Sequence, residues 1–400
     1  MLFTPDRHEP IRESTFTDAA AREAIVRIAA RAERELDRAK GLWPRDPVDE
    51  QRAGEGRASS LYWGAAGIAW ALDELAAGGY AAAVDLDFVD GLDARIVNDP
   101  DDPDFGYPGV WFAAGGVLAV AERRRPDAAR RDRLAELAHE SLGSPGLEPM
   151  EGHPGYMLLA AQLHAKTGEK RWSSFWTAGA ERLLAEWEYD DRLGWLWAQS
   201  LGGRESRYVG AAHGLVGNVR VLRNGGRLLA DAQREEIDRR AVETLTRLAV
   251  VEDGHANWPP AAGNPLVAND RIRVQWCHGS AGVLAGMWDA APEHDAWTEL
   301  LLAAGRLVWD AGPLRDQPGL CHGTAGNAYA LLSLWRRTGD ELWLERAHAF
   351  AQHAAAQVEE RATRLGRGHH SLFTGDEGVA LCLASCIERD ARFPVADRLI

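Results

Sequence analysis

The chain has 400 residues, 46% of them hydrophobic, and carries a formal net charge of -15 with a sequence pI near 5.4. This apolar content is enough for a large core, whereas the acidic balance disfavours binding to nucleic acid or to an anionic membrane surface. No stretch approaches the roughly 20 apolar residues of a membrane-spanning helix, and the first residues show no signal-peptide pattern. We therefore expect a soluble, cytoplasmic protein.

The first predicted element is a helix from about Ala19 to Lys40, preceded by the N-cap residue types Thr17 and Asp18. We assign residues 1–50 to a helical N-terminal extension that packs on the rest of the chain. Residues 51–400 repeat one pattern, in which a Gly-x-x-Gly turn leads into an apolar helix and a more amphipathic helix follows. The turns lie at 64–67, 152–155, 214–217, 279–282, 323–326 and 375–378, with a weaker instance at Gly115-Gly116.

This repetition predicts the architecture. The turns are spaced by roughly 40 to 65 residues, which suits one helical hairpin per repeat. The helix after each turn is apolar nearly all round, as in residues 325–332, and such helices are buried. The helices between them carry charge on one face, as in residues 340–347, and are expected to face solvent. The sequence therefore predicts an all-α fold, an α/α toroid of about seven helical-hairpin repeats with the glycine turns at one end.

Two of the turns carry metal-ligand residue types. Cys277 precedes one Gly-rich turn, and Cys321 and His322 precede the next. Two thiolates and an imidazole favour Zn2+, and a disulfide framework is not expected in a reducing compartment. Only three ligands are evident, and an open fourth position is typical of a catalytic zinc site. We therefore predict a zinc centre that binds and activates a further group.

The other two cysteines and most of the tryptophans are expected to pack in the core. Cys382 and Cys386 are four residues apart on an apolar helix, where thiols pack as small hydrophobic groups. The 16 tryptophans would suit sugar stacking in a carbohydrate enzyme, but most of them, including Trp63, Trp70 and Trp335, lie in or beside apolar helices. That alternative also leaves both cysteine motifs unexplained.

A histidine occupies the equivalent place in a third turn. His213 stands directly before Gly214, as His278 and His322 stand before their own glycines. Equivalent positions of a ring converge on one end, so His213 is expected near the metal while remaining free for proton transfer. The sequence thus predicts a metal centre with a nearby acid–base residue.

These motifs resemble those of the lanthionine synthetase C-like family. The resemblance is carried by residues 213–214, by Trp-Cys-His-Gly at 276–279 and by residues 319–329, and the repeats extend it from about residue 55 to 390. It implies a seven-fold α/α toroid in which Cys277, Cys321 and His322 hold zinc and His213 is the acid–base residue. The family often has a carboxylate four residues before the glycine of an earlier repeat, and Glu148 fits that place.

The resemblance also implies a reaction, the addition of a thiol to dehydroalanine or dehydrobutyrine to form a thioether. The first candidate substrate is a dehydrated precursor peptide that the protein cyclises through the peptide's own cysteine. The second is glutathione, added to dehydrated residues of damaged proteins, and a non-catalytic zinc-binding scaffold is a third possibility. The chain shows no fused dehydratase or kinase, so a separate enzyme is expected to make the electrophile.

Two further features bear on the choice of thiol. His278 stands where many peptide-cyclising members of the family have tyrosine, and it matches the glutathione-adding type; it is expected beside the ligands rather than on the metal. Arg271 and Arg273 lie just upstream of Cys277 and are candidates for contacting an anionic group such as a glutathione carboxylate. Their alternative interpretation is a solvated charged loop.

Overall fold

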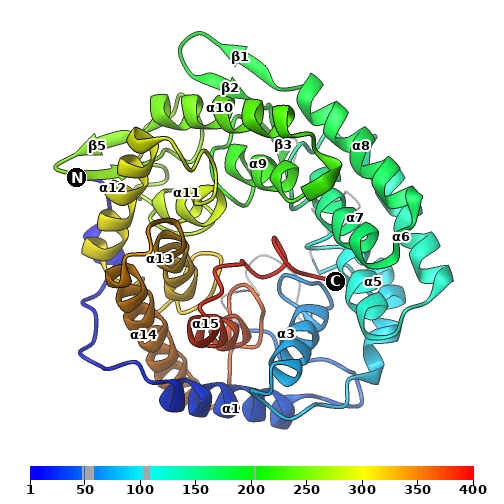
Figure 1. Cartoon of the computed structure of the whole chain (residues 1–400). Helices are drawn as coiled ribbons and strands as arrows, with labels where there is room; N and C mark the ends of the chain where they lie inside the picture. Colours follow the sequence, from blue (N-terminus) through cyan, green and yellow to red (C-terminus); the bar gives the residue numbers. More distant parts are fainter. Residues whose placement is uncertain (47–48, 50–57, 102–108, 202–203) are drawn as a thin grey trace.

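A computed structural model describes residues 1–46, 49, 58–101, 109–201 and 204–400, and in this part of the chain fourteen α-helices form two concentric rings (Figure 1). The inner ring contains α3 (Ala65–Ala77), α5 (Ala114–Arg124), α7 (His153–Thr167), α9 (Leu215–Arg223), α11 (Ser280–Met287), α13 (Thr324–Thr338) and α15 (Asp376–Glu388). The outer ring contains α1 (Asp18–Glu35), α4 (Leu92–Asn98), α6 (Ala128–Ser141), α8 (Lys170–Ala185), α10 (Asp231–Leu248), α12 (Asp295–Ala311) and α14 (Glu341–Leu365). The predicted all-α toroid is confirmed.

The ring closes between its first and last repeats. The last inner helix, α15, packs against α3, and α1 packs against α15 from outside. Helix α1 begins as predicted, since the Thr17 side chain accepts a hydrogen bond from the Ala20 N–H at 3.2 Å. It ends at Glu35 rather than near Lys40, because Leu36 adopts an extended conformation. The proposed boundary between extension and barrel, near residue 50, lies outside the described residues.

The burial of the helices follows the apolar pattern of the sequence. Residues 324–334 of α13 are buried on every side, whereas α14 buries a stripe and exposes the opposite face. The same division separates the other inner and outer helices, as amphipathic patterning requires. Cys382 and Cys386 are buried in α15, as predicted. No helix among the described residues is long and apolar enough to cross a membrane.

Three short antiparallel ribbons lie in the connections between helices. They pair β1 (Glu188–Asp190) with β2 (Gly194–Leu196), β3 (Gln199–Leu201) with β4 (Arg204–Ser206), and β5 (Val250–Glu252) with β6 (His255–Asn257). Short 3-10 helices are η1 (Pro5–Arg7), η2 (Asp87–Gly91) and η3 (Gly226–Leu228). The ribbons were not predicted, although the Asp253-Gly254 turn, with both φ angles positive, is a recognised hairpin signal.

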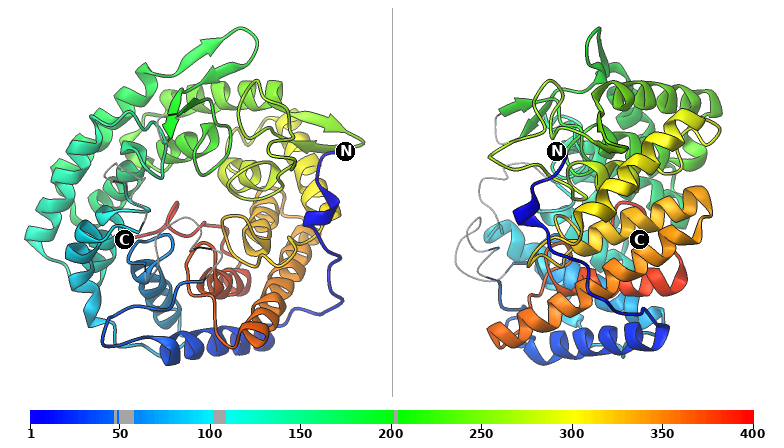
Figure 2. Two further views of the ribbon diagram at one scale, coloured as in Figure 1. Left: turned by 180° about the vertical axis from the view of Figure 1, so that it is seen from behind. Right: turned by 90° about the vertical axis from the view of Figure 1, so that its left-hand side faces the viewer.

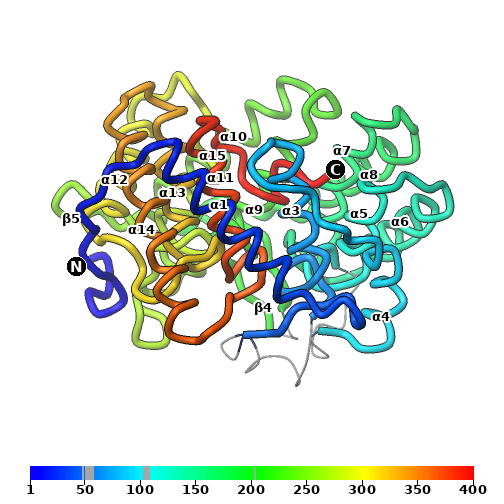
Figure 3. Tube along the Cα trace, turned by 90° about the horizontal axis from the view of Figure 1, so that it is seen from below, coloured from blue at the N-terminus to red at the C-terminus, as the bar shows by residue number. Residues whose placement is uncertain are grey.

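Both ends of the chain contact the ring. The N-terminal segment runs along its outer side past α12 before entering α1 (Figures 2 and 3), where the His8 ring is 2.8 Å from the Gly312 carbonyl oxygen. The C-terminal segment turns into the middle of the ring (Figure 1). There Phe393 stacks on Trp276, with ring centroids 4.5 Å apart, and Asp397 pairs with Arg220 at 2.6 Å. The chain after the last helix thus packs beneath the turn that carries Cys277.

Candidate metal centre

The turns before the inner helices are joined to one another by backbone hydrogen bonds. The N–H of Cys277 donates to the carbonyl of Cys321 at 3.0 Å, and the N–H of Cys321 donates to Phe373 at 2.9 Å. Phe373 donates to Tyr62 at 3.3 Å, and Tyr62 donates to Trp111 at 2.9 Å. Each of these five residues stands two positions before the cap of its helix. The closed ring therefore brings equivalent turn positions together at one end, as predicted.

The second glycine of each turn permits this close arrangement. A Cβ at Gly326 would overlap the Leu320 carbonyl oxygen, and one at Gly282 would overlap the Trp276 carbonyl oxygen. The turn before α11 needs glycine for another reason as well, since Gly279 has a φ of +90° that side chains rarely adopt. The repeated Gly-x-x-Gly pattern is thus explained by backbone packing against the turn itself.

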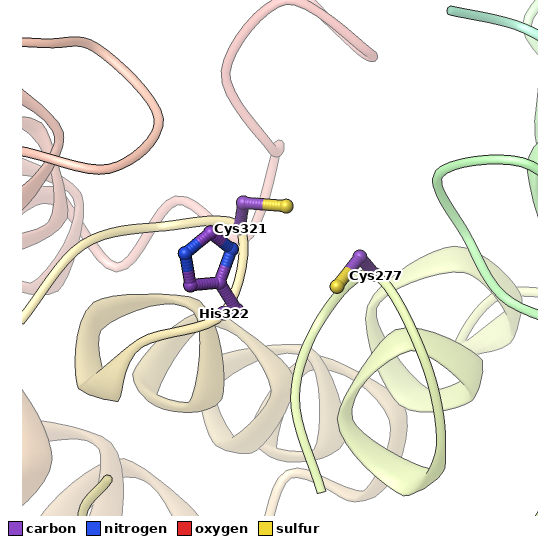
Figure 4. Close-up of side chains that lie close together, drawn as sticks. All are labelled: Cys277, Cys321 and His322. Carbon is purple, nitrogen blue, oxygen red and sulfur yellow. The ribbon is translucent and has the colours of Figure 1, made fainter. Parts of the chain in front are cut away.

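The structure brings Cys277, Cys321 and His322 together, and their ligand atoms all lie within 4.8 Å of one another. Figure 4 shows Cys277 on the turn before α11, across from Cys321 and His322 on the turn before α13. Both cysteines are buried, and His322 is partly exposed. Tetrahedral Zn2+ with Zn–S bonds of about 2.3 Å places two sulfurs about 3.8 Å apart, so these residues fit the ion after only small adjustments.

The surroundings of Cys277 favour its thiolate form. Hydrogen bonding with Cys321 and His322, together with nearby histidine charge, holds the pKa of Cys277 well below its usual value, although burial opposes this. The Gln275 side-chain amide also donates to the Cys277 sulfur at 2.9 Å. Metal ligands must be deprotonated to bind, so this environment suits a metal-binding thiolate.

His213 forms a buried pair with Glu148. Its Nδ1 is 2.8 Å from a carboxylate oxygen of Glu148, whose side chain is fully buried and which also accepts from the Met150 and Glu151 N–H groups. An ionised carboxylate only accepts, so Nδ1 carries the hydrogen and Nε2 is left for chemistry. Burial alone would lower the pKa of His213, but Glu148 outweighs it and the pKa is raised. The turn that carries His213 packs against the turn that carries Cys277, because a Cβ at Gly210 would overlap the Cys277 carbonyl oxygen.

His278 lies beside the ligands but is not part of the ligand group. Burial lowers its pKa, with a smaller opposing effect from Cys277, and its Nδ1 has no hydrogen-bond partner among the described residues. Its backbone exchanges hydrogen bonds with Gln275, the residue that contacts the Cys277 sulfur. Burial therefore favours the neutral form of the His278 imidazole.

A third arginine, Arg7, lies close to Arg271 and Arg273, and the sequence did not reveal this. Arg7, from the N-terminal segment, donates to the side chain of Gln275 at 3.3 Å. Burial and the charges of Arg271 and Arg273 lower its pKa, while Cys277 raises it. Arg7 therefore lies close enough to both arginines and to Cys277 for their charges to act on it. The contribution of Arg7 depends on the path of the N-terminal segment around the ring, which no local motif indicates.

A cavity of 320 Å³ opens on the His322 side of the centre. Acidic and basic side chains line it together: Arg361 pairs with Asp46 at 2.7 Å, and Arg364 pairs with Asp316 at 3.3 Å. His322 itself forms part of the lining. The cavity therefore leads directly to one of the candidate ligands, and two ion pairs lie in its wall.

The fold and the site together define a class, α/α toroids in which turns at one end of the ring bring together two cysteines and a histidine that could hold a metal ion. The model of the lanthionine synthetase C-like protein family matches residues 17–397, and the chain belongs to that family. The resemblance of the turn motifs to the family is confirmed.

Named relatives were found by sequence and by structure. LanC-like protein GCL1 of Arabidopsis thaliana is 34% identical over 47% of this chain and 43% of its own length. Glutathione S-transferase LANCL1 of Danio rerio is 34% identical over 48% of this chain and 46% of its own. The chain thus matches less than half the length of these relatives. A nisin cyclase structure superposes with a TM-score of 0.61 and 15% identity, covering 84% of this chain and 91% of that one, which is a likeness of fold alone.

Proposed function

We propose that the protein is a zinc-dependent enzyme that adds a thiol to dehydroalanine or dehydrobutyrine residues. One observation carries the proposal: two cysteines and a histidine converge within 4.8 Å, beside a histidine paired with a buried carboxylate. Cys277, Cys321 and His322 would hold the metal. With only three protein ligands, a zinc ion held there could also bind a thiol, and it would lower the pKa of that thiol and make it a nucleophile near neutral pH.

His213 would carry the proton that the reaction moves. The thiol loses a proton, its sulfur bonds to the β-carbon, the carbon–carbon double bond opens, and the α-carbon must gain a proton. His213 fits as the group that holds this proton at Nε2, because Glu148 binds Nδ1 and favours the protonated ring. Glu148 would orient the ring, as a carboxylate behind a catalytic histidine commonly does.

Glutathione is the thiol that the surroundings support best. At neutral pH it carries two carboxylates and one ammonium group. The cavity beside His322 offers both signs of charge, with Arg364 and Asp316 at its edge. Arg7, Arg271 and Arg273 add positive charge near Cys277. The name of the Danio rerio relative points to the same thiol.

Intramolecular addition is the second candidate, because the same metal centre would serve a cysteine within the substrate peptide. The ring shares its fold with a nisin cyclase, and that likeness does not discriminate between the two thiols. In either case the electrophile comes from dehydration of serine or threonine, a reaction that a separate dehydratase or kinase partner would supply.

The test is mass spectrometry of a dehydroalanine peptide incubated with the zinc-loaded protein. One sample receives glutathione, and another contains a peptide with its own cysteine; Cys277→Ala is the control in both. A glutathione adduct that requires Cys277 supports the proposal. Ring closure without an adduct shifts the function to peptide cyclisation. No product in either sample, with one zinc bound per chain, favours a scaffold role and contradicts the proposal.

A further inference from the structure

The chain after the last helix, α15, turns into the middle of the ring and is anchored there (Figure 1). Its anchor is Asp397, which pairs with Arg220 at 2.6 Å and accepts from the Asn224 side chain at 2.9 Å. Arg220 belongs to α9 and Asn224 caps it, and α9 is the inner helix that begins just after His213. The Asp397 carboxylate also accepts from the Phe393 N–H at 2.8 Å. The anchor therefore fixes the backbone of Phe393 inside the ring.

The Phe393 ring packs on two aromatic rings of the inner wall. It stacks on Trp276, with centroids 4.5 Å apart and an interplanar angle of 3°, and it meets Tyr329 of α13 at 5.1 Å and 60°. All three side chains are buried. The cavity that remains beside Trp276 and Phe393 has a volume of 20 Å³, room for about one water molecule. The three rings thus fill this part of the ring, and the indole of Trp276 has little space in which to move.

Trp276 shares a closed turn with Cys277. The N–H of Gln275 donates to the His278 carbonyl, and the N–H of His278 donates to the Gln275 carbonyl, both at 3.1 Å. Trp276 and Cys277 are the two residues at the tip of this turn. The indole packs on Phe393, whereas the Cys277 sulfur lies with the other candidate ligands (Figure 4). A displacement of the indole would therefore reach the sulfur through a single peptide unit of a short, hydrogen-bonded turn.

We propose that Phe393 is a positioning residue of the candidate metal centre, which supports Trp276 and so holds the Cys277 sulfur at the spacing that a metal ion requires. This inference rests on the proposed metal centre, and it adds to that centre a residue from outside the helical repeats. A thiolate binds Zn2+ at about 2.3 Å, so a displaced sulfur binds less well. Phe393 in this role touches neither metal nor substrate; it acts through Trp276.

The test is a double-mutant cycle on the affinity of the full chain for Co2+, measured by competition with a chelator and by the visible absorption of the bound ion. The cycle combines Phe393→Leu with Trp276→Leu. Phe393→Met, which removes less volume, is a milder second variant at the same position. Phe350→Leu is the matched control, because Phe350 is a fully buried phenylalanine of α14 that packs on Trp309 of α12. Urea denaturation of every variant gives its loss of stability.

The expected result is a loss of about 10-fold in Co2+ affinity for Phe393→Leu, the lower end of what contacts that orient metal ligands commonly contribute. The visible spectrum of the bound ion should change with it. Phe350→Leu should keep the affinity and spectrum of wild type although it also lowers stability. The double variant should bind no more weakly than Trp276→Leu alone, because Phe393 acts through Trp276.

Three outcomes overturn the role of Phe393: unchanged affinity in both Phe393 variants, an equal loss in Phe350→Leu, or losses that add in the double variant. An equal loss in the control would show that the affinity follows general stability. Additive losses would show that Phe393 and Trp276 act independently. Absence of stoichiometric cobalt binding by the wild-type chain overturns the metal centre itself.

Discussion

The pair formed by His213 and Glu148 gives the sharpest prediction for activity. Replacing Glu148 with glutamine removes the charge but nearly keeps the shape. Burial then dominates, so the pKa of His213 falls and the protonated ring becomes scarcer at neutral pH. In wild type the raised pKa of His213 keeps its protonated form present to higher pH. In Glu148→Gln that pKa falls, so the descending limb of the rate profile should move to lower pH.

The magnitude follows from the contacts of the carboxylate. A hydrogen bond to a charged group contributes about 1.5–3 kcal/mol, which corresponds to a loss of about 10- to 150-fold in kcat/KM if proton delivery limits the rate. Glu148 also accepts from two backbone N–H groups, and an amide offers only one oxygen in their place. A buried donor left unpaired destabilises the fold by about 1–3 kcal/mol, so urea denaturation must accompany the kinetics.

The assay measures kcat/KM against pH for addition of glutathione to a dehydroalanine peptide. Glu151→Gln is the graded comparison, because the charge of Glu151 also raises the pKa of His213 but contributes less than Glu148. Its profile should therefore move less. A Glu148→Gln protein that is folded and zinc-loaded, yet overlays the wild-type profile, would refute the reasoning about His213.

Three further predictions concern the metal, the ring closure and the turns. His213→Asn should keep one zinc per chain by elemental analysis while slowing addition, and loss of zinc would contradict its assignment. His370 lies 2.8 Å from each of two carboxylates, those of Glu35 and Glu377, and their charge raises its pKa to about 10. The contribution of protonated His370 to the stability of the fold is therefore complete below about pH 6.5 and is lost as the pH rises through about 10. His370→Gln leaves the buried Glu377 without its cationic partner, with only the Ser371 N–H still donating to it, and urea denaturation at pH 6 should show a loss of about 3–5 kcal/mol. Gly326→Ala should lower the melting temperature despite better helix propensity, whereas Gly143→Ala, whose Cβ would meet its nearest atom at 3.5 Å, should not.

The toroid could be predicted from the sequence because a short local pattern marks the start of each inner helix and recurs along the chain. The Gly-x-x-Gly turns marked the starts of the inner helices, and the apolar helices after them are the buried ones. Cys277, Cys321 and His322 could be grouped because equivalent positions of a closed ring converge, and the structure brings them together. The same offset as that of His322 led us to expect His213 at this end of the ring, and the structure pairs it with Glu148 at 2.8 Å.

The residues that were missed depend on contacts that no local pattern encodes. Arg7 reaches Gln275 only because the N-terminal segment follows the outside of the ring, and the two are far apart in sequence. The cavity beside His322 combines Asp46 with Arg361, again from opposite ends of the chain. Helix α1 stops before Lys40 because Asp37 pairs with Leu42 in a local turn, a choice that helix periodicity does not reveal.

Tyr62 lies between these two cases. Its offset before Gly64 is the same as that of Cys277 before Gly279, so the repeat pattern contained the signal, but a tyrosine among aromatic neighbours looks like core. The Tyr62 ring stacks on Phe373, which holds the equivalent position of the last turn, so both of these positions are filled by packed aromatic rings. In a closed toroid every turn borders the same end, so a position that packs in one repeat can hold a metal ligand in the next.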